Sequence, residues 1–173
     1  DVYKRQAQEY LKDQLGLNKI ITNKNLMSLI SQLRLSKKKI VFTNGCFDIL
    51  HPGHVRLFNE ARSLGDVLIV GLNSDASVKA LKGEARPINS FGSRAEVISG
   101  LGAVDYVIEF DAPTPIDLIS KIVPDVLVKG GDYKIEEIVG HDVVQANGGE
   151  VRSLAVHNGY STTRIVNDIA RLR

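Results

Sequence analysis

The stretch Thr43–His54, with the sequence TNGCFDILHPGH, is the part of this chain of 173 residues around which the rest is organised. A short β-branched and aromatic run, Lys39–Phe42, precedes it and is typical of a buried strand. After the stretch, apolar residues recur at helical spacing among charged ones, at Val55, Leu57, Phe58 and Ala61. The stretch therefore connects a strand to a helix, as in an α/β unit.

Histidines and glycines give this connection its chemistry. Gly45 and Gly53 let the backbone approach a ligand closely, and Pro52 suits the first turn of a helix. The N-terminus of a helix carries unpaired N–H groups and a partial positive charge, so it attracts phosphate. His51 and His54 are three residues apart, which puts both imidazoles on one side of that turn. Two such donors beside a phosphate-binding helix end are what nucleotidyl transfer needs.

Strands and helices alternate through the rest of the chain. Further strands are predicted at 66–72, 104–110, 125–129 and 150–156. Helices are predicted at 74–81, 93–101, 114–122 and from about 161 onward. The predicted fold class is therefore α/β, a Rossmann-like doubly wound sheet of about five parallel strands. In such sheets ligands bind outside the carboxyl ends of the strands, where the strand order reverses.

Four motifs in order carry a resemblance to a known family. H-x-G-H at 51–54 is followed by LKG at 81–83 with Arg86-Pro87, by VKGGDY at 128–133 and by GYSTTRI at 159–165. Over about residues 40–169 the chain resembles the nucleotidylyltransferase superfamily, in its cytidylyltransferase-like branch. The residues of the four motifs are most similar to those of adenylyltransferases that act on D-glycero-β-D-manno-heptose 1-phosphate. Such enzymes occur stand-alone or as the C-terminal half of a bifunctional kinase–adenylyltransferase.

This resemblance implies transfer of AMP from ATP to the heptose 1-phosphate. The products would be ADP-heptose, a precursor of the lipopolysaccharide core, and pyrophosphate. The predicted catalytic residues are His51, His54 and Lys82. Charge builds on the phosphoryl oxygens as pyrophosphate leaves, so donors held in place supply the catalysis. The resemblance implies that both imidazoles contact the nucleotide phosphates and that Lys82 contacts the triphosphate.

The same motifs predict the residues that bind the two substrates. The predicted nucleotide-binding residues are Thr43, Asn44, Gly45, Cys46, Phe47, Gly53, Lys129, Gly159, Ser161, Thr162 and Thr163. The predicted substrate-binding residues are Asp48, Asn73, Arg86, Arg94 and Asp132. The alternatives are that Asp48 holds the turn, that Arg94 faces solvent and that Asp132 caps a loop. Nothing indicates a thiolate nucleophile at Cys46.

Zinc at the two histidines is an alternative that the sequence argues against, because no third His or Cys is clustered with them. Mg²⁺ is the expected ion, bound chiefly through the triphosphate and water, so no protein ligand is predicted for a metal.

The identity of the nucleotide depends on the residues before the last motif. Cytidylyltransferases for glycerol or choline phosphates carry Arg-Thr-Glu-Gly there, whereas this chain has Val156-His157-Asn158-Gly159. The missing arginine favours ATP over CTP. Two other hypotheses remain open. One is a CTP-dependent cytidylyltransferase acting on a polyol or amino-alcohol phosphate, and the other is a non-catalytic nucleotide-sensing domain.

Composition narrows the class of protein. Hydrophobic residues make up 43% and charged residues 24%, which is ordinary for a soluble globular protein. A net charge of +2 is too small to indicate nucleic-acid binding. No apolar run approaches 18 residues, so no membrane span is predicted. The single cysteine allows no internal disulfide, and a cytoplasmic location is expected. ATP and a sugar phosphate are the expected partners, and a homodimer and a sugar-phosphate kinase, fused or separate, are further expectations.

Residues 1–36 lack the strand pattern and are predicted to be an N-terminal helical extension or linker, with the nucleotidylyltransferase domain at 37–173. Helices are predicted there at Ala7–Leu15 and Asn25–Leu35. Two interpretations are open, namely a linker or tail of an upstream domain and an extension that covers a sheet edge. The second is preferred.

Overall fold

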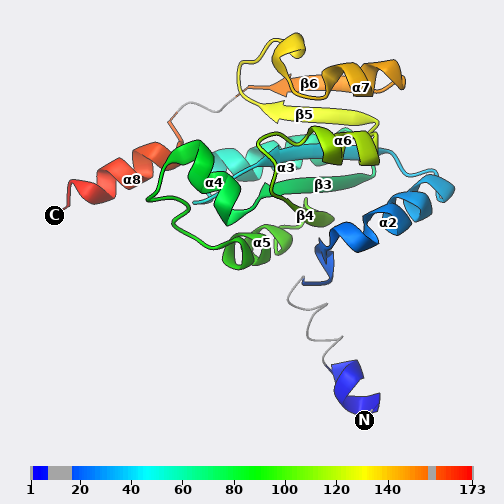
Figure 1. Ribbon diagram of the computed structural model, residues 1–173, viewed down its shortest axis with the longest axis horizontal. Helices are drawn as coiled ribbons and strands as arrows, with labels where there is room; N and C mark the ends of the chain where they lie inside the picture. Colours follow the sequence, from blue (N-terminus) through cyan, green and yellow to red (C-terminus); the bar gives the residue numbers. More distant parts are fainter. Residues whose placement is uncertain (1, 8–16, 156–158, 173) are drawn as a thin grey trace.

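The computed structural model describes residues 2–7, 17–155 and 159–172. Within these ranges six parallel strands form one sheet in the order β1-β4-β3-β2-β5-β6 (Figure 1). The strands are β1 (Ile20–Ile21), β2 (Ile40–Gly45), β3 (Val67–Asn73), β4 (Tyr106–Phe110), β5 (Val126–Gly130) and β6 (Glu150–Leu154). The predicted α/β class and parallel sheet are confirmed.

Helices connect the strands, and some of them start at a serine cap. They are α2 (Asn23–Leu35), α3 (Pro52–Ser63), α4 (Asp75–Lys82), α5 (Phe91–Ser99), α6 (Ile116–Ile122), α7 (His141–Ala146) and α8 (Thr162–Ala170), with short 3-10 helices η1 (Leu17–Lys19) and η2 (Ile135–Glu137). The Ser74 hydroxyl accepts from the N–H of Ser77 and starts α4. The Ser161 hydroxyl accepts from the N–H of Arg164 and starts α8. Both serines stand where helices were predicted to start, and each satisfies an N–H group that the helix leaves unpaired.

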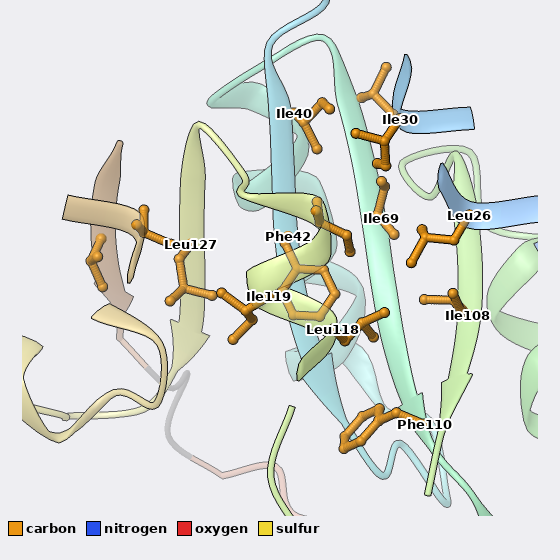
Figure 2. Close-up of a cluster of buried hydrophobic side chains, with 14 of the residues drawn as sticks. Leu26, Ile30, Ile40, Phe42, Ile69, Ile108, Phe110, Leu118, Ile119 and Leu127 are labelled. Carbon is orange, nitrogen blue, oxygen red and sulfur yellow. The ribbon is translucent and has the colours of Figure 1, made fainter. Parts of the chain in front are cut away.

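Two apolar clusters, one on each face of the sheet, make a three-layered molecule. Alternate residues of a strand point to opposite faces, so Phe42 and Val41 of β2 belong to different clusters. Figure 2 shows the first cluster, in which α2 and α6 place Leu26, Ile30, Leu118 and Ile119 over the strands. On the other face, α3 and α5 contribute Phe58, Ala61, Ala95 and Ile98. Full burial of each large apolar side chain contributes about 1.5–3 kcal/mol, so both helical layers are held firmly.

The strand order reverses beside β2. From β2 the chain winds outward through β3 and β4, and it then returns to place β5 and β6 on the other side of β2. The pairs Val41↔Val126 and Thr43↔Val128 set the register of β2 against β5. The carboxyl ends of β2 and β5 therefore flank the reversal, which is where open parallel sheets bind ligands.

Some elements differ from the prediction. The sheet has a sixth strand, β1, which is too short to show a strand pattern and is defined by pairing with Val107 and Ile108. Neither η2 nor α7 was predicted, and β6 ends at Leu154 rather than at residue 156. The predicted helix at Ala7–Leu15 lies largely outside the described residues, although residues 2–7 are helical.

The N-terminal segment is part of the sheet and its core. Strand β1 forms one edge of the sheet beside β4, and Leu26 and Ile30 of α2 are buried in the first cluster. Residues 20–35 therefore supply an edge strand of the sheet and a helix that packs on its core, and the predicted division at residues 36 and 37 stays a prediction.

Candidate active site

The paired histidines, His51 and His54, lie at the start of α3. His51 stands at the N-cap position with an extended backbone, φ −144° and ψ 168°, and its side chain makes no cap hydrogen bond. Pro52 occupies the first helical position. This places the two imidazoles on one side of the first turn. Their rings stack with centroids 3.7 Å apart and planes inclined by 21°. The helix N-terminus and both rings thus form one surface with donors suited to an anion.

Each imidazole has one nitrogen that is unpaired within the described part of the chain. Nδ1 of His51 and Nδ1 of His54 are both buried and have no hydrogen-bond partner among the described residues. Burial lowers the pKa of His51, and burial together with the charge of His51 lowers the pKa of His54 to about 4. Both rings are therefore neutral near pH 7. A buried polar atom without a partner costs about 1–3 kcal/mol, which marks this pair as a place for a ligand.

Phe47 and two glycines hold the histidines in place. Phe47 has φ 44°, and its ring meets His54 edge-on at 5.1 Å and packs on Phe58 at 4.8 Å. A Cβ on Gly45 would come within 2.9 Å of the Phe47 ring, and a Cβ on Gly53 would come within 3.0 Å of the His51 ring. Side chains at either position would therefore displace a ring of the site.

The loop after β2 leads from the strand to His51 at the start of α3; we call this loop, residues 46–51, the signature loop. The Thr43 hydroxyl is fully buried and is a third polar group without a partner among the described residues. Cys46 Sγ lies 3.7 Å from Asn73 Oδ1, and Asn73 Nδ2 donates to Ser77 Oγ at 2.9 Å. Asn44 is partly exposed on the same strand end. Asn73, predicted to bind substrate, thus lies beside the signature loop but is bonded to protein groups.

Basic side chains gather around Cys46. Burial raises the pKa of its thiol, and the charges of Lys82, Arg94, Lys129 and Arg86 only partly oppose this. Cys46 is therefore a thiol, in agreement with the absence of any sign of a thiolate nucleophile in the sequence. Burial also lowers the pKa of Lys129, and the nearby charge of Lys82 lowers it further. The two lysines, from α4 and β5, thus lie at one rim.

Glycines let the end of β5 approach α3. A Cβ on Gly130 would come within 2.9 Å of Leu57, and Gly131 has φ 137°. Asp132, predicted to bind substrate, is exposed in the loop that follows. In the motif at 128–133, Lys129 is the residue whose charge acts on the Cys46 thiol, so it lies close to the signature loop.

The start of α8 lies against the signature loop. Thr162 Oγ1 donates to the carbonyl of Ile49 at 3.1 Å. The Tyr160 ring is nearly parallel to the His51 ring, with centroids 6.2 Å apart, and the Arg56 guanidinium lies 5.6 Å from the Tyr160 centroid. Gly159 and Thr163, from the same motif, are exposed, and Ser161 caps the helix. Three predicted nucleotide-binding motifs, from β2, β5 and α8, therefore meet around α3.

Sequence reasoning missed Tyr160 and Arg56. Tyr160 lies inside the last motif, in which the residues predicted to bind the nucleotide were Gly159, Ser161, Thr162 and Thr163. Arg56 is one of several exposed charges on α3, and only the fold shows that it faces Tyr160. The motif Val156–Gly159, used to separate ATP from CTP, lies largely outside the described residues.

Two predicted substrate-binding residues are turned toward the protein. Asp48 is 3% exposed, and its carboxylate accepts hydrogen bonds from Arg86 Nε and from the N–H groups of Ile88 and Asn89. Burial raises the pKa of Asp48, but these bonds outweigh burial and bring it below its usual value. Arg94 is 2% exposed, so the alternative that it faces solvent is wrong. Both side chains are bonded within the protein, and their contact with substrate stays a prediction.

Hollows elsewhere in the described chain do not mark the site. One, of about 210 Å³, lies at the carboxyl end of β4 beside Asn23 and Pro115, and another, of about 260 Å³, lies among Arg34 and Lys37–Lys39. Neither includes the paired histidines, so the candidate site is assigned from its side-chain chemistry. In the described ranges no three His, Cys, Asp or Glu side chains are grouped to hold a metal ion. No described helix has the length and apolar character needed to cross a membrane.

Comparisons with known proteins place the chain in a family. Residues 42–168 match the cytidylyltransferase-like family. The chain is 56% identical over 167 residues to the bifunctional protein HldE of Campylobacter concisus, covering 95% of this chain and 34% of the relative. It is 54% identical over 154 residues to HldE of Haemophilus ducreyi, covering 89% of this chain and 32% of the relative. The chain thus spans about a third of the length of these relatives.

A solved structure is also similar. The crystal structure of the lipopolysaccharide core biosynthesis protein from Thermoplasma volcanium matches with a TM-score of 0.58 and 28% identity, covering 72% of this chain and 99% of that chain. The matched family region includes the paired histidines, both lysines of the rim and the start of α8. This chain belongs to the cytidylyltransferase-like family.

Proposed function

We propose that this chain is a nucleotidyltransferase that joins AMP from ATP to D-glycero-β-D-manno-heptose 1-phosphate. An oxygen of the sugar phosphate attacks the α-phosphorus of ATP, the bond between the α- and β-phosphates breaks, and ADP-heptose and pyrophosphate form. The observation that carries the proposal is the stacked histidine pair at the N-terminus of α3, whose rings are neutral and whose Nδ1 atoms have no partner among the residues that the structure describes. The similarity to HldE proteins and to a lipopolysaccharide core biosynthesis protein supports this choice of substrates.

The residues of the site suit this reaction. The attacking phosphate is already an anion, so the enzyme needs no base to activate it. Its task is to hold two anionic substrates together and to stabilise the charge that builds on the α-phosphoryl and departing oxygens. His51 and His54 donate hydrogen bonds from neutral rings, the N-terminus of α3 adds N–H groups, and Lys82 and Lys129 supply positive charge at the rim. Thr162 and Thr163 at the start of α8 are proposed to bind the β- and γ-phosphates.

Mg²⁺ is proposed to accompany the triphosphate. The donors at the rim are imidazoles and ammonium groups, which suit phosphate oxygens rather than a hard cation. Because Mg²⁺ retains several waters and binds readily through substrate phosphates, it needs no protein cage here. The ion would screen the charge of the triphosphate.

The test is a panel of nucleotides and acceptors. ATP and CTP are each supplied with heptose 1-phosphate, glycerol 3-phosphate and phosphoethanolamine, and pyrophosphate release is followed. We expect turnover with ATP and heptose 1-phosphate. A preference for CTP with a polyol or amino-alcohol phosphate would show a cytidylyltransferase instead. Tight ATP binding without turnover on any acceptor would indicate a nucleotide sensor.

Two variants of α3 test the role of the histidines. His54→Ala is expected to keep the fold, as judged by circular dichroism, and to lose most turnover. Asn59→Ala, at an exposed position on the same helix, is the matched control and should keep wild-type turnover. Undiminished activity of His54→Ala would refute the mechanism. A homodimer and a sugar-phosphate kinase, fused or separate, remain proposed partners, and light scattering of the purified chain tests the first.

A further inference from the structure

Arg94 links three separate parts of the site. Its Nη1 donates to the Cys46 carbonyl at 2.8 Å, its Nε to the Asn89 carbonyl at 2.9 Å and its Nη2 to Asp75 Oδ1 at 2.7 Å. These groups belong to the signature loop, to the segment before α5 and to the first residue of α4. Every nitrogen of the guanidinium is thus bonded to the protein.

Asp48 makes a second link between the same segments. Its carboxylate accepts from Arg86 Nε at 2.6 Å and from the N–H groups of Ile88 and Asn89 at 2.8 Å each. Asn89 Nδ2 donates in return to the Asp48 carbonyl at 2.6 Å. The signature loop and residues 86–89 are therefore joined by side-chain and backbone bonds in both directions.

These bonds bracket Lys82. Lys82 is the last residue of α4, and Arg94 binds Asp75 at the first residue of that helix. On the other side of Lys82, residues 86–89 are bound by Asp48 and Arg94. Lys82 itself is exposed, so the anchors on its two flanks define where its ammonium group can reach.

We infer that Arg94 and Asp48 are positioning residues, which hold α4 and residues 86–89 against the signature loop and so fix Lys82 at the rim of the histidine site. The inference rests on the proposed function, since it assigns Lys82 to the bound triphosphate. It differs from the expectation that these residues bind substrate directly. A buried guanidinium with three bonds to fixed partners acts through geometry, and a lysine cannot reproduce its planar fork.

A double-mutant cycle tests this role. The variants are Arg94→Lys, Lys82→Ala and the two combined, with turnover measured at saturating substrates. A displacement of about 1 Å can lower a rate about a hundredfold. We expect Arg94→Lys to lower kcat by about 10- to 100-fold when Lys82 is present, and by less than about threefold when it is absent. Asp48→Asn, measured in the same two backgrounds, should behave in the same way.

A matched control is available in Arg62. Its Nε lies 2.9 Å from Asp105 Oδ2 and its Nη1 donates to the Gly65 carbonyl at 2.7 Å, so it is also a bridging arginine, but it lies at the far end of α3. Arg62→Lys should keep wild-type kcat. If Arg94→Lys lowers kcat by the same factor with and without Lys82, or leaves it unchanged, the inference is overturned.

Failure of the positioning role can be distinguished from failure of the proposed function. If the wild-type chain turns over none of the acceptors, the proposed function fails. The same cycle is then measured as ATP dissociation constants. A loss of affinity in Arg94→Lys that disappears in the Lys82→Ala background supports positioning, and independent effects of the two substitutions refute it.

Discussion

The neutral state of His54 makes a quantitative prediction about stability. Burial and the neighbouring His51 lower the pKa of His54 from 6.5 to about 4 in the folded chain. In the unfolded chain the ring has its ordinary pKa. Between these two values the unfolded state binds a proton that the folded state does not, so the free energy of unfolding falls as the pH falls from 6.5 toward 4. The stability from the neutral ring is fully present above pH 6.5.

The size of the effect follows from the two pKa values. One pKa unit corresponds to about 1.4 kcal/mol, so the whole interval is worth about 3 kcal/mol at most and the part between pH 6.5 and 5 is worth about 2 kcal/mol. For a domain of ordinary stability, about 5–15 kcal/mol, this is a large fraction.

Urea unfolding at pH 7.5 and pH 5.0 measures this contribution. The loss of unfolding free energy between the two pH values should be about 2 kcal/mol larger for the wild type than for His54→Asn. Asn59→Ala, on the exposed side of the same helix, should lose as much as the wild type. Equal losses in the wild type and His54→Asn, or a His54 ring that titrates near pH 6.5 by NMR, would show that the ring is not held neutral by its surroundings.

Three further predictions test the site and the fold. Gly53→Ala should lower turnover at least tenfold while keeping the melting temperature within a few degrees, because its Cβ would press on the His51 ring at 3.0 Å; unchanged kinetics would contradict this. Leu26→Ala should lower the free energy of unfolding by about 2–5 kcal/mol and Met27→Ala by less than about 0.5 kcal/mol, because only the first side chain is in the core; similar urea midpoints would show that α2 is not part of the cooperative unit. Thr162→Val should raise the KM for ATP and lower stability by about 1 kcal/mol or less, because it loses a hydrogen bond to the signature loop; an unaltered KM would argue against the proposed phosphate contact.

The sequence predicted those parts of the fold that depend on local pattern. The apolar runs of β2 and β3 show their buried character directly, and Ser74 and Ser161 mark helix starts by residue type alone. Strand β1 escaped prediction because two residues carry no periodicity, and only its pairing with β4 makes it a strand. Helix α7, with six residues, is likewise too short for its spacing to stand out.

Long-range pairing explains what the sequence did not reveal about the site. Arg94 and its acceptor Cys46 are 48 residues apart, and Asp48 and Arg86 are 38 apart. The sequence predicted that Asp48, Arg86 and Arg94 bind substrate, with Asp48 holding the turn as the alternative, but it gave no indication of which distant segments these side chains would bond to. The spacing of the paired histidines predicted that both rings lie on one side of the turn, whereas their stacking and the loss of their charge depend on how the fold packs and buries them.

The exposure of helix α8 has a consequence for how this chain loses activity in denaturant. No residue of α8 is buried, although its first turn carries the threonines proposed to hold the outer phosphates. Elements with few buried groups open at free energies well below that of global unfolding. Activity should therefore be lost at a lower concentration of denaturant than the one that unfolds the sheet. Saturating ATP binds only the docked form of the helix, so it should bring the loss of activity closer to the unfolding of the sheet.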